Sequence, residues 1–437
     1  MMYKKYTEYK PSGIDWVSAI PKSWEVLPAF IVVKDVCIKN VDGVEDNVLS
    51  LSYGNIVKRN LDDNFGLLPE SFNTYQIVSE GNIVLRLTDL QNDKKSLRVG
   101  YVNEKGIITS AYLNLACLKY LESRYAYFLL HSYDLTKVFY GMGGGLRQSM
   151  KFEDLKRLPI IIPSYSEQLS IVQFLDAEIA KIDQLIRKQE KLIELLKEKR
   201  QAVISHAVTK GLNSDVEMKY SCVEWLGYIP EHWSIVKFSY CVSIRSGLVD
   251  PKSEQYKKYW LIAPNHIQSG EGRILKLETA EEQGAESSKY LCKKGEVIYS
   301  KIRPALAKVC ISPENNVLCS ADMYPMTACS GLTNDYLSWF LLSSIFTRFA
   351  VNQADRVAMP KINRESLAEC KIPFPKKSEQ IEIAYYLQRI TKKLDDLIVK
   401  SQESISLLKE RRSALISAAV TGKIDVRNWQ SDAKDAA

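Results

Sequence analysis

The clearest pattern in the chain is a regular spacing of apolar residues between Ser166 and Gly211. Apolar side chains follow alternating steps of four and three, which predicts one long helix whose apolar seam packs on a partner helix. Pro163 blocks extension of this helix backwards, and Gly211 is well placed to end it. A polar arginine, Arg200, interrupts the seam. The predicted seam residues are Leu175, Ile179, Ile182, Ile186, Gln189, Ile193, Leu196 and Val203.

The partner helix is predicted in the same chain, over residues 378–422. This second stretch aligns with the first at a constant spacing, and its polar interruptions coincide with those of the first. Ser401 matches Gln189, and Arg412 matches Arg200. Unrelated helices of an ordinary bundle would not share a register in this way, so the agreement favours an internal duplication. The second set of seam residues is Leu387, Leu394, Ile398, Ser401, Ile405, Leu408 and Leu415.

The repeat extends to a short segment that precedes each globular region. Residues 12–26 read SGIDWVSAIPKSWEV and residues 221–235 read SCVEWLGYIPEHWSI, so that Trp24 matches Trp233. We interpret these tryptophans as packed core anchors rather than as platforms for stacked bases, since large aromatic side chains dominate protein cores. The order of segments is therefore domain, helix, domain, helix.

Between these landmarks the sequence indicates both strands and helices. Residues 47–52 and 83–87 are apolar runs bounded by Gly, Asn and Asp, which is typical of short strands. Residues 121–140 and 336–351 are rich in Leu, Phe and Tyr at helical spacing, which predicts core helices. The expected fold is α+β, with two similar domains, a long antiparallel two-helix coiled coil and a pseudo-two-fold axis. The predicted boundaries are 1–163 and 213–375 for the domains, 164–212 and 376–424 for the helical spacers, and 425–437 for a tail.

The order of segments also predicts how the helices run. A helix of this length spans about 60 Å, and the two ends of a domain commonly lie close together. With domains and helices alternating, the helices would then be antiparallel and would hold the two domains apart. Such an arrangement suits a target with two separated features, as when two-fold symmetric proteins read DNA half-sites at a fixed spacing.

Composition adds few restrictions. The chain has 437 residues, a formal charge of +7 and a pI of about 8.7, so a polyanionic partner is permitted but not required. No apolar run reaches transmembrane length, and no apolar signal segment is visible at the start. Nine cysteines are scattered without a CxxC motif, which favours a reducing cytoplasm. We interpret Cys310, Cys319 and Cys329 as buried thiols rather than zinc ligands.

Several of these elements resemble one known family, the specificity subunits of type I restriction-modification systems. The resemblance rests on Pro163 followed by Ser-Glu-Gln at 166–168, on LLKEKRQAVISHAVTKG at 195–211, and on the copies of both in the second half. The segment GEVIYSKIRP at 295–304 is also similar to this family. The resemblance covers the chain from residue 12 to about residue 424.

The resemblance implies a subunit that binds DNA and has no catalytic centre. In this family, two target-recognition domains each read one half of a split sequence in double-stranded DNA. Two modification subunits dock around the helices and methylate one adenine in each half, and restriction subunits (translocase and nuclease) are optional further partners. S-adenosylmethionine, ATP and Mg²⁺ are then expected in the partner subunits, and no cofactor or metal is expected in this chain. The alternatives are an orphan bipartite DNA-binding protein or a coiled-coil adaptor without a methyltransferase partner.

Catalysis by this chain itself is the competing class, and the motifs that it requires are missing. An adenine methyltransferase needs an Asn/Asp-Pro-Pro-aromatic loop, but no Pro-Pro-aromatic sequence occurs, nor does a GxxxxGKS or GxxxxGKT loop for ATP. In the repeat, His206 falls opposite Ala418 and His232 opposite Ser23, so neither is a repeated catalytic element. The glycine-rich residues 141–149 follow a helix-like stretch and are interpreted as a flexible loop near the binding face.

Basic and polar residues in turn-like segments of both domains are the candidate DNA contacts. Lysine and arginine bind phosphates, and arginine and glutamine also bind base edges. Residues 81–89 of the first domain, GNIVLRLTD, lack the Arg-Pro of 295–304, so a contact made by Arg303 does not transfer directly to Arg86. The candidates are Arg86, Lys94, Lys95, Arg98, Arg147, Gln148, Ser149, Lys151, Lys252, Lys257, Lys258, Arg273, Lys301, Arg303, Lys308, Arg356 and Lys361.

Overall fold

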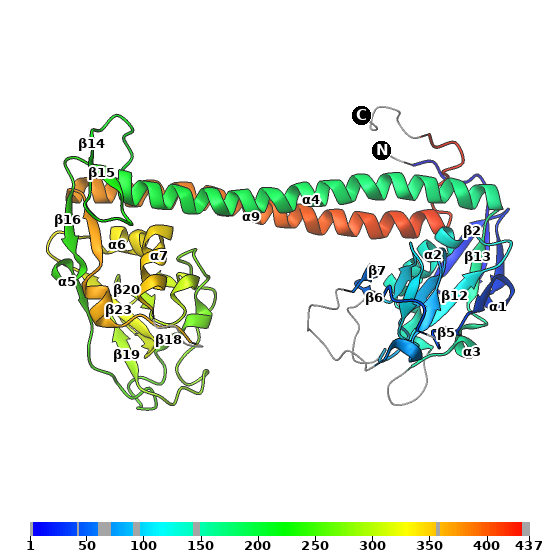
Figure 1. Ribbon diagram of the computed structural model, residues 1–437, viewed down its shortest axis with the longest axis horizontal. Helices are drawn as coiled ribbons and strands as arrows, with labels where there is room; N and C mark the ends of the chain where they lie inside the picture. The colour runs from blue at the N-terminus through cyan, green and yellow to red at the C-terminus, as the bar shows by residue number, and fades with distance from the viewer. Residues whose placement is uncertain are drawn as a thin grey trace. The chain divides into compact units, whose positions relative to one another are not determined.

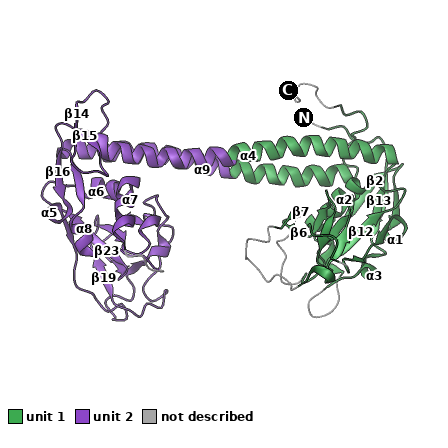
Figure 2. Cartoon of the chain, in the orientation of Figure 1, with its two compact units in different colours: residues 1–189, 403–437 green, residues 190–402 purple. Residues whose placement is uncertain are grey.

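The computed structural model describes residues 3–41, 43–59, 71–90, 97–142, 149–354 and 359–430. The chain forms two compact units, Met1–Gln189 with Glu403–Ala437, and Glu190–Gln402 (Figure 2). The long helices α4 (Tyr165–Lys210) and α9 (Lys377–Val420) each give one half to each unit. The compact units therefore include the helices, which the sequence-based boundaries treat as separate spacers.

The two long helices pack together within each unit, as the seam predicts (Figure 1). In unit 1, Asp183 of α4 meets Arg412 of α9, with Arg412 Nε 3.4 Å from Asp183 Oδ1. Phe174, nearer the start of α4, lies against Trp429, beyond the end of α9, with ring centroids 5.4 Å apart. Residues later in α4 therefore contact residues earlier in α9, so the two helices run antiparallel.

Unit 2 has the same antiparallel arrangement. Arg200 of α4 donates to Asp395 of α9 at 2.9 Å. Gly211, at the end of α4, lies beside Glu379 near the start of α9, where a Cβ on the glycine would be 3.3 Å from the carboxylate. Gly211 has φ of +77°, the left-handed backbone that favours glycine after a helix. All predicted seam residues are buried or half-buried, from Leu175 and Leu387 at 0% exposure to partly exposed Gln189.

The globular part of unit 1 is built from small antiparallel sheets and short helices. A four-stranded sheet has the order β10-β9-β12-β4, and a three-stranded sheet has the order β11-β8-β5. Strand β3 pairs with β13, and two hairpins, β1-β2 and β6-β7, complete the set. The bounds are β1 (Tyr9–Ile14), β2 (Val17–Pro21), β3 (Glu25–Pro28), α1 (Ala29–Val32), β4 (Val33–Asp35), β5 (Ile38–Lys39), β6 (Leu49–Ser52), β7 (Asn55–Lys58), η1 (Phe72–Thr74), β8 (Gln76–Val78), β9 (Ile83–Leu85), β10 (Val99–Tyr101), β11 (Gly106–Ile108), β12 (Leu113–Cys117), α2 (Ser123–Leu135), η2 (Val138–Gly141), α3 (Phe152–Leu155) and β13 (Pro159–Ile162).

Unit 2 repeats the four-stranded sheet and the first and last strand pairs of this plan, but its three-stranded sheet is different. Its four-stranded sheet has the order β17-β23-β20-β21, strand β16 pairs with β24, and β14 pairs with β15. Its three-stranded sheet, β18-β22-β19, contains a parallel pair, β18 with β22. The bounds are β14 (Met218–Tyr220), β15 (Tyr228–Pro230), β16 (Ser234–Lys237), α5 (Phe238–Cys241), β17 (Val242–Ile244), β18 (Trp260–Ile262), η3 (Pro264–His266), β19 (Lys289–Cys292), β20 (Val297–Ser300), η4 (Pro304–Leu306), β21 (Val309–Ile311), β22 (Val317–Ser320), β23 (Met323–Ala328), α6 (Asn334–Leu342), α7 (Ser344–Gln353), α8 (Arg364–Ala368) and β24 (Lys371–Phe374).

Strand pairing shows that the two units are duplicates at the level of register. Leu85 of β9 lies opposite Val99 of β10, and Tyr299 of β20 lies opposite Val309 of β21.

The predicted helix over 336–351 is divided into α6 and α7. Ser343 causes the break, because it has an extended backbone and its side chain accepts a hydrogen bond from Phe346 N as an N-cap.

The paired tryptophans are core anchors, as predicted. Trp24 is fully buried and Trp233 is 1% exposed. Trp24 packs edge-on against Tyr6, with ring centroids 5.6 Å apart. Trp233 donates its indole N–H to Glu379 at 3.0 Å. Neither ring is available for stacking on bases.

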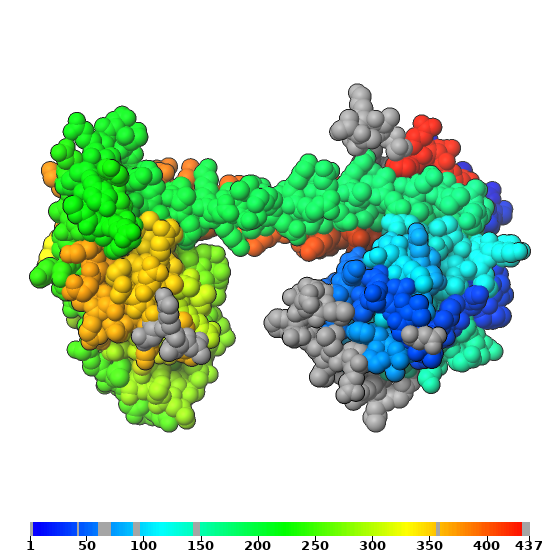
Figure 3. Space-filling view, in the orientation of Figure 1, coloured from blue at the N-terminus to red at the C-terminus, as the bar shows by residue number. Residues whose placement is uncertain are grey.

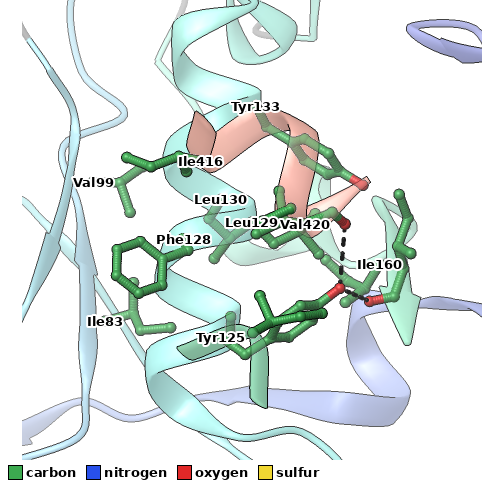
Figure 4. Close-up of a cluster of buried hydrophobic side chains, with 14 of the residues drawn as sticks. Ile83, Val99, Tyr125, Phe128, Leu129, Leu130, Tyr133, Ile160, Ile416 and Val420 are labelled. Atoms are coloured by element: carbon green, nitrogen blue, oxygen red, sulfur yellow. Dashed lines mark hydrogen bonds between the residues drawn. The ribbon is translucent and has the colours of Figure 1, made fainter. Parts of the chain in front are cut away.

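A buried tyrosine in unit 1 joins its core to the end of α9 (Figure 4). Tyr125 of α2 donates to Ile161 O at 3.1 Å and lies 3.3 Å from Val420 O. The last carbonyls of a helix have no partner within the helix, so a hydroxyl at this point satisfies one of them. Around the tyrosine, α2 side chains such as Leu129 pack against Ile416 of α9 in one apolar cluster.

Unit 2 makes the same contact with α4. Tyr336 of α6 has its hydroxyl 2.9 Å from Val208 O and 3.0 Å from Pro373 O. Ile204 and Val208 of α4 belong to the buried core of this unit. Each unit therefore contains the start of one long helix and the end of the other.

The repeated Ser-Glu-Gln motif also has a structural explanation. Gln168 donates to Tyr120 O and Pro163 O, both at 3.0 Å, and accepts from Glu122 N at 2.8 Å. In unit 2, the glutamine in the same position of the motif donates to Pro375 O and a glycine carbonyl and accepts from a threonine N–H. The glutamine thus ties the loop before each core helix to the start of its long helix.

We predict that Tyr336→Phe destabilises the chain by about 1–3 kcal/mol, because it leaves buried carbonyls without their donor. Tyr299→Phe is the matched control. Tyr299 is equally buried, but its hydroxyl has no hydrogen-bond partner among the described residues, so its loss should be neutral or stabilising. Chemical denaturation of the two variants measures the difference, and equal stability losses would contradict the assigned role of Tyr336.

Candidate nucleic-acid interface

The loop after β20 places two candidate basic residues next to a third. Ile362 N donates to Lys301 O at 2.9 Å, and Arg303 N donates to Pro360 O at 2.7 Å. These bonds hold the loop after β20 beside the segment that contains Lys361. Arg303 has φ of +48°, an uncommon conformation for a residue with a side chain, and such residues concentrate at functional sites.

The same surface continues onto a turn from the preceding part of the unit. Gly270 N donates to Ala307 O at 3.2 Å, which joins the turn at 268–273 to the end of η4. Lys308 donates its Nζ to Pro264 O at 2.5 Å. We call Arg273, Lys301, Arg303, Lys308 and Lys361 the basic surface of unit 2, because backbone hydrogen bonds connect their segments.

Members of the basic surface differ in how free their charges are. Arg303 and Lys361 are exposed, and neither forms an ion pair within the described part of the chain. Arg273 is exposed but lies 3.3 Å from Glu271. Lys301 lies over the ring of Tyr324, 5.4 Å from its centre. Arg303 and Lys361 are therefore the groups best placed to bind a phosphate or a base edge.

A groove beside Arg303 was not anticipated from the sequence. It has a volume of about 720 Å³ and is lined by Arg303, Leu306, Val351 and Pro360, among others. Leu306 and Val351 are about two-fifths exposed and lie beside this charged loop. Apolar side chains in such a place can contact thymine methyl groups.

Three further candidates in unit 2 lie on another segment. Lys252, Lys257 and Lys258 belong to the stretch that leads from Val249, which pairs with β19, to β18. Lys252 lies 3.6 Å from Glu286, and Lys257 lies 2.7 Å from a glutamate three residues earlier. Lys258 is exposed.

In unit 1 the corresponding loop follows β9. Met150 N donates to Leu87 O at 2.9 Å, which brings exposed Ser149 and Lys151 beside the loop that contains Arg86. Five other candidates lie outside the described residues: Lys94, Lys95, Arg147, Gln148 and Arg356.

Arg98 is not a DNA contact, which corrects the prediction. Its side chain is fully buried. The guanidinium donates to three backbone carbonyls of the loop after β9, at 2.9–3.3 Å, and to Tyr140 Oη at 2.9 Å. A turn-like sequence context indicated exposure, but the arginine folds back onto the turn and holds it in place.

Matching the two units residue by residue explains why their basic loops differ. Arg98 and Lys308 are equivalent, since Arg98 O accepts from Arg86 N and Lys308 O accepts from Ser300 N. Counting from these positions, the equivalent of Arg303 is Asp89, which has the same left-handed backbone with φ of +58°. At this position unit 1 thus has the same left-handed backbone, with an acidic side chain in place of a basic one.

The described residues provide no candidate metal centre. They contain no group of three His, Cys, Asp or Glu side chains that could hold a metal ion. Cys310 and Cys319 are buried, as predicted, but Cys329 is exposed, so that part of the prediction is wrong. Cys329 lies in the turn after β23, at the surface of the unit. No helix in the described ranges is both long and apolar enough to cross a membrane.

Comparison with known proteins identifies the class. The family model for the type I restriction modification DNA specificity domain matches residues 56–195 and 230–407, once in each half of the chain. The chain belongs to this family. The family is the DNA-recognition component of type I restriction-modification systems and is not catalytic.

Individual relatives agree with this assignment. The chain is 28% identical over 330 residues to the specificity subunit of the type I restriction enzyme EcoDI of Escherichia coli, covering 72% of this chain and 73% of the relative. It is 24% identical over 428 residues to the MjaVIII specificity subunit of Methanocaldococcus jannaschii, covering 94% and 95%.

Two solved structures share the fold. A chain from a structural study of complex assembly and conformational transition of the type I R-M system superposes with a TM-score of 0.69 at 15% identity, covering 93% of this chain and 99% of that one. The HsdS subunit of Thermoanaerobacter tengcongensis superposes with a TM-score of 0.53 at 14% identity, covering 93% and 98%.

We predict an acid-sensitive core in unit 1, because burial and the charge of Arg412 lower the pKa of His131 to about 4. The folded chain keeps this histidine neutral, whereas the unfolded chain binds a proton below its ordinary pKa of about 6.5. Stability should therefore fall by about 2 kcal/mol between pH 7 and pH 5.

The prediction is tested with the variant His131→Leu, because unit 2 has a leucine, Leu342, at the equivalent position. This variant should lose that part of the pH dependence in urea denaturation at the two pH values. If the free energy of unfolding of the variant changed between pH 7 and pH 5 as much as that of the wild-type chain, the assignment to His131 would be contradicted.

Proposed function

We propose that this chain reads a two-part sequence in double-stranded DNA, with the globular part of each unit reading one half. The single observation that carries the proposal is the duplication. The same family model matches twice, and the same hydrogen-bonded frame is built twice around loops that differ. A repeated frame with different loops suits two half-sites of different sequence.

In unit 2 the basic surface and its groove would bind the half-site. Arg303 and Lys361 supply free positive charge for phosphates or guanine edges, and Leu306 supplies an apolar contact. In unit 1 the equivalent place is the loop after β9, with Arg86, Ser149 and Lys151 as the described candidates. Lys252, Lys257 and Lys258 remain candidates for additional phosphate contacts.

The long helices would hold the modification subunits. Several large apolar side chains on α4 are 42–49% exposed, namely Leu185, Leu192 and Leu195. Figure 3 shows atoms of the middle part of α4 at the surface that faces the viewer. On α9, Leu397 and Leu407 are 48% and 65% exposed. Rows of exposed apolar residues mark protein interaction sites.

The chemistry would then reside in the partners. We propose that the modification subunits bring S-adenosylmethionine and transfer its methyl group to one adenine in each half-site. Restriction subunits, where present, would use ATP and Mg²⁺. We also propose a cytoplasmic location, since all nine cysteines are free thiols, which suits a reducing compartment.

The function is tested by expressing the chain with its modification subunits and mapping N6-methyladenine across the host genome. We expect one split motif with a methylated adenine in each half, which disappears when this chain is deleted. A stable complex of the proteins without such a motif would favour an orphan DNA-binding protein or an adaptor.

For the docking surface, we predict that the double variant Leu192→Lys and Leu195→Lys weakens the complex with the modification subunit at least about tenfold. Both side chains are largely exposed, so the stability of the chain should change by less than about 1 kcal/mol. Glu198→Lys is the control, a change of charge at an exposed polar position of the same helix. Titration by calorimetry measures binding, and equal affinity in all three proteins would exclude this surface.

A further inference from the structure

A buried arginine connects three segments of unit 2. Arg200 occupies an interruption of the apolar seam and is only 4% exposed. Its Nε donates to Asp395 Oδ1 at 2.9 Å, its Nη1 to Gly270 O at 2.7 Å and its Nη2 to Glu271 O at 2.9 Å. A buried guanidinium is costly unless its donors are paired, and here each of its three nitrogens has an acceptor. One side chain thus joins α4, α9 and the turn at 268–273.

That turn connects the helices to the basic surface. Gly270 N donates to Ala307 O, at the end of the short helix that follows Arg303. On its other side the turn presses against α6, since a Cβ on Gly272 would lie 2.9 Å from Leu342 Cδ1. Gly272 also has φ of +75°. The position of the basic surface on the helix pair is therefore coupled to the bonds of Arg200.

The equivalent arginine of unit 1 does not make this connection. Arg412 contacts Asp183 at 3.4 Å, and its buried Nε has no hydrogen-bond partner of good geometry. Among the described residues, no backbone carbonyl accepts a hydrogen bond from it. The pocket beside it, about 320 Å³ in volume, is also lined by Asn55 and Asn103.

In unit 1, the globular part is attached to the long helices through a different arginine. Arg124 of α2 places its Nε 2.9 and 2.8 Å from the two carboxylate oxygens of Asp176 on α4. The guanidinium also lies over the ring of Tyr101, 5.3 Å from its centre. In unit 2 the residues equivalent to Arg124 and Asp176 are Asp335 and Gln388, which cannot form this pair.

We propose that Arg200 and Arg124 are positioning residues. Arg200 sets how the basic surface of unit 2 sits on the helix pair, and Arg124 sets how α2 and β10 of unit 1 sit on it. They would thereby limit the spacing between half-sites that the protein accepts. The inference rests on the proposed function. Planar guanidinium groups suit this role because several hydrogen bonds in one plane fix an angle as well as a distance.

The first test compares Arg200→Lys with Arg412→Lys, the matched control at the equivalent position. Lysine keeps the positive charge beside the aspartate, but one ammonium cannot reproduce the planar fork that serves two carbonyls and a carboxylate. The full chain in complex with its modification subunits is given duplexes with both half-sites at the natural gap, or with one base pair more or fewer. Initial methylation rates are measured on each duplex.

We expect Arg200→Lys to lose about tenfold in discrimination between the natural and altered gaps, and Arg412→Lys to keep the wild-type ratio. The bases required within each half-site should be unchanged in both variants. A contribution of Arg200 to stability alone would lower all rates together without changing their ratio. Unchanged gap discrimination in Arg200→Lys, or an equal loss in Arg412→Lys, would overturn the proposal.

A second measurement separates this proposal from the proposed function, because it needs no DNA. Hydrogen–deuterium exchange on the full chain reports the protection of the Gly270 amide, which donates to Ala307 O. We expect residues 268–273 to exchange faster than in the wild-type chain in Arg200→Lys, and at the wild-type rate in Arg412→Lys. If the wild-type complex methylates no DNA, the proposed function fails, and hydrogen–deuterium exchange alone then tests whether Arg200 holds the turn at 268–273. Unchanged protection of this turn in Arg200→Lys would refute that role.

Arg124→Lys provides an independent variant if Arg200→Lys does not fold. Its side chain is 37% exposed, so the chain should tolerate the change. We expect the same loss of gap discrimination, with faster exchange confined to α2 and the facing part of α4. Gap discrimination equal to wild type in this variant would remove Arg124 from the proposal.

Discussion

The constraint on which the structure depends is that neither repeat can complete its own core. Each long helix has an apolar seam that must be covered, and its last carbonyls need donors from outside the helix. In unit 1 the end of α9 fills the core and Tyr125 meets Val420 O. In unit 2 the end of α4 does the same, and Tyr336 meets Val208 O. Because each unit takes the end of the other repeat's long helix into its core, the duplication completes both cores at once.

This shared frame leaves the loops free to differ. The order of the four-stranded sheet and the bonds of the glutamine of the Ser-Glu-Gln motif are the same in both units. The loop after β9 and the loop after β20 keep the same left-handed turn, but Asp89 stands where unit 2 has Arg303. A recognition protein with two half-sites needs this separation, because changes in a loop then alter contacts without altering the core.

The arginines show how one residue type takes different roles in similar surroundings. Arg98 is buried and holds a turn, whereas Arg303 is exposed on the equivalent turn of the other unit. Arg200 bonds the helices to a turn, whereas Arg412, its equivalent in the repeat, contacts Asp183 and donates to no backbone carbonyl among the described residues. For Arg200 and Arg412 the difference arises from the segment that approaches the guanidinium, and not from the residue itself.

The sequence alone was sufficient for the long helices, their shared register, the duplication, the buried tryptophans and the family. These features depend on periodicity and on spacing along the chain, which are local and repeat themselves. The burial of Arg98, the exposure of Cys329 and the equivalence of Asp89 with Arg303 were decided only by the tertiary structure. Whether a side chain is free or bonded depends on which distant segments pack against it, and a pattern along one segment carries no information about them.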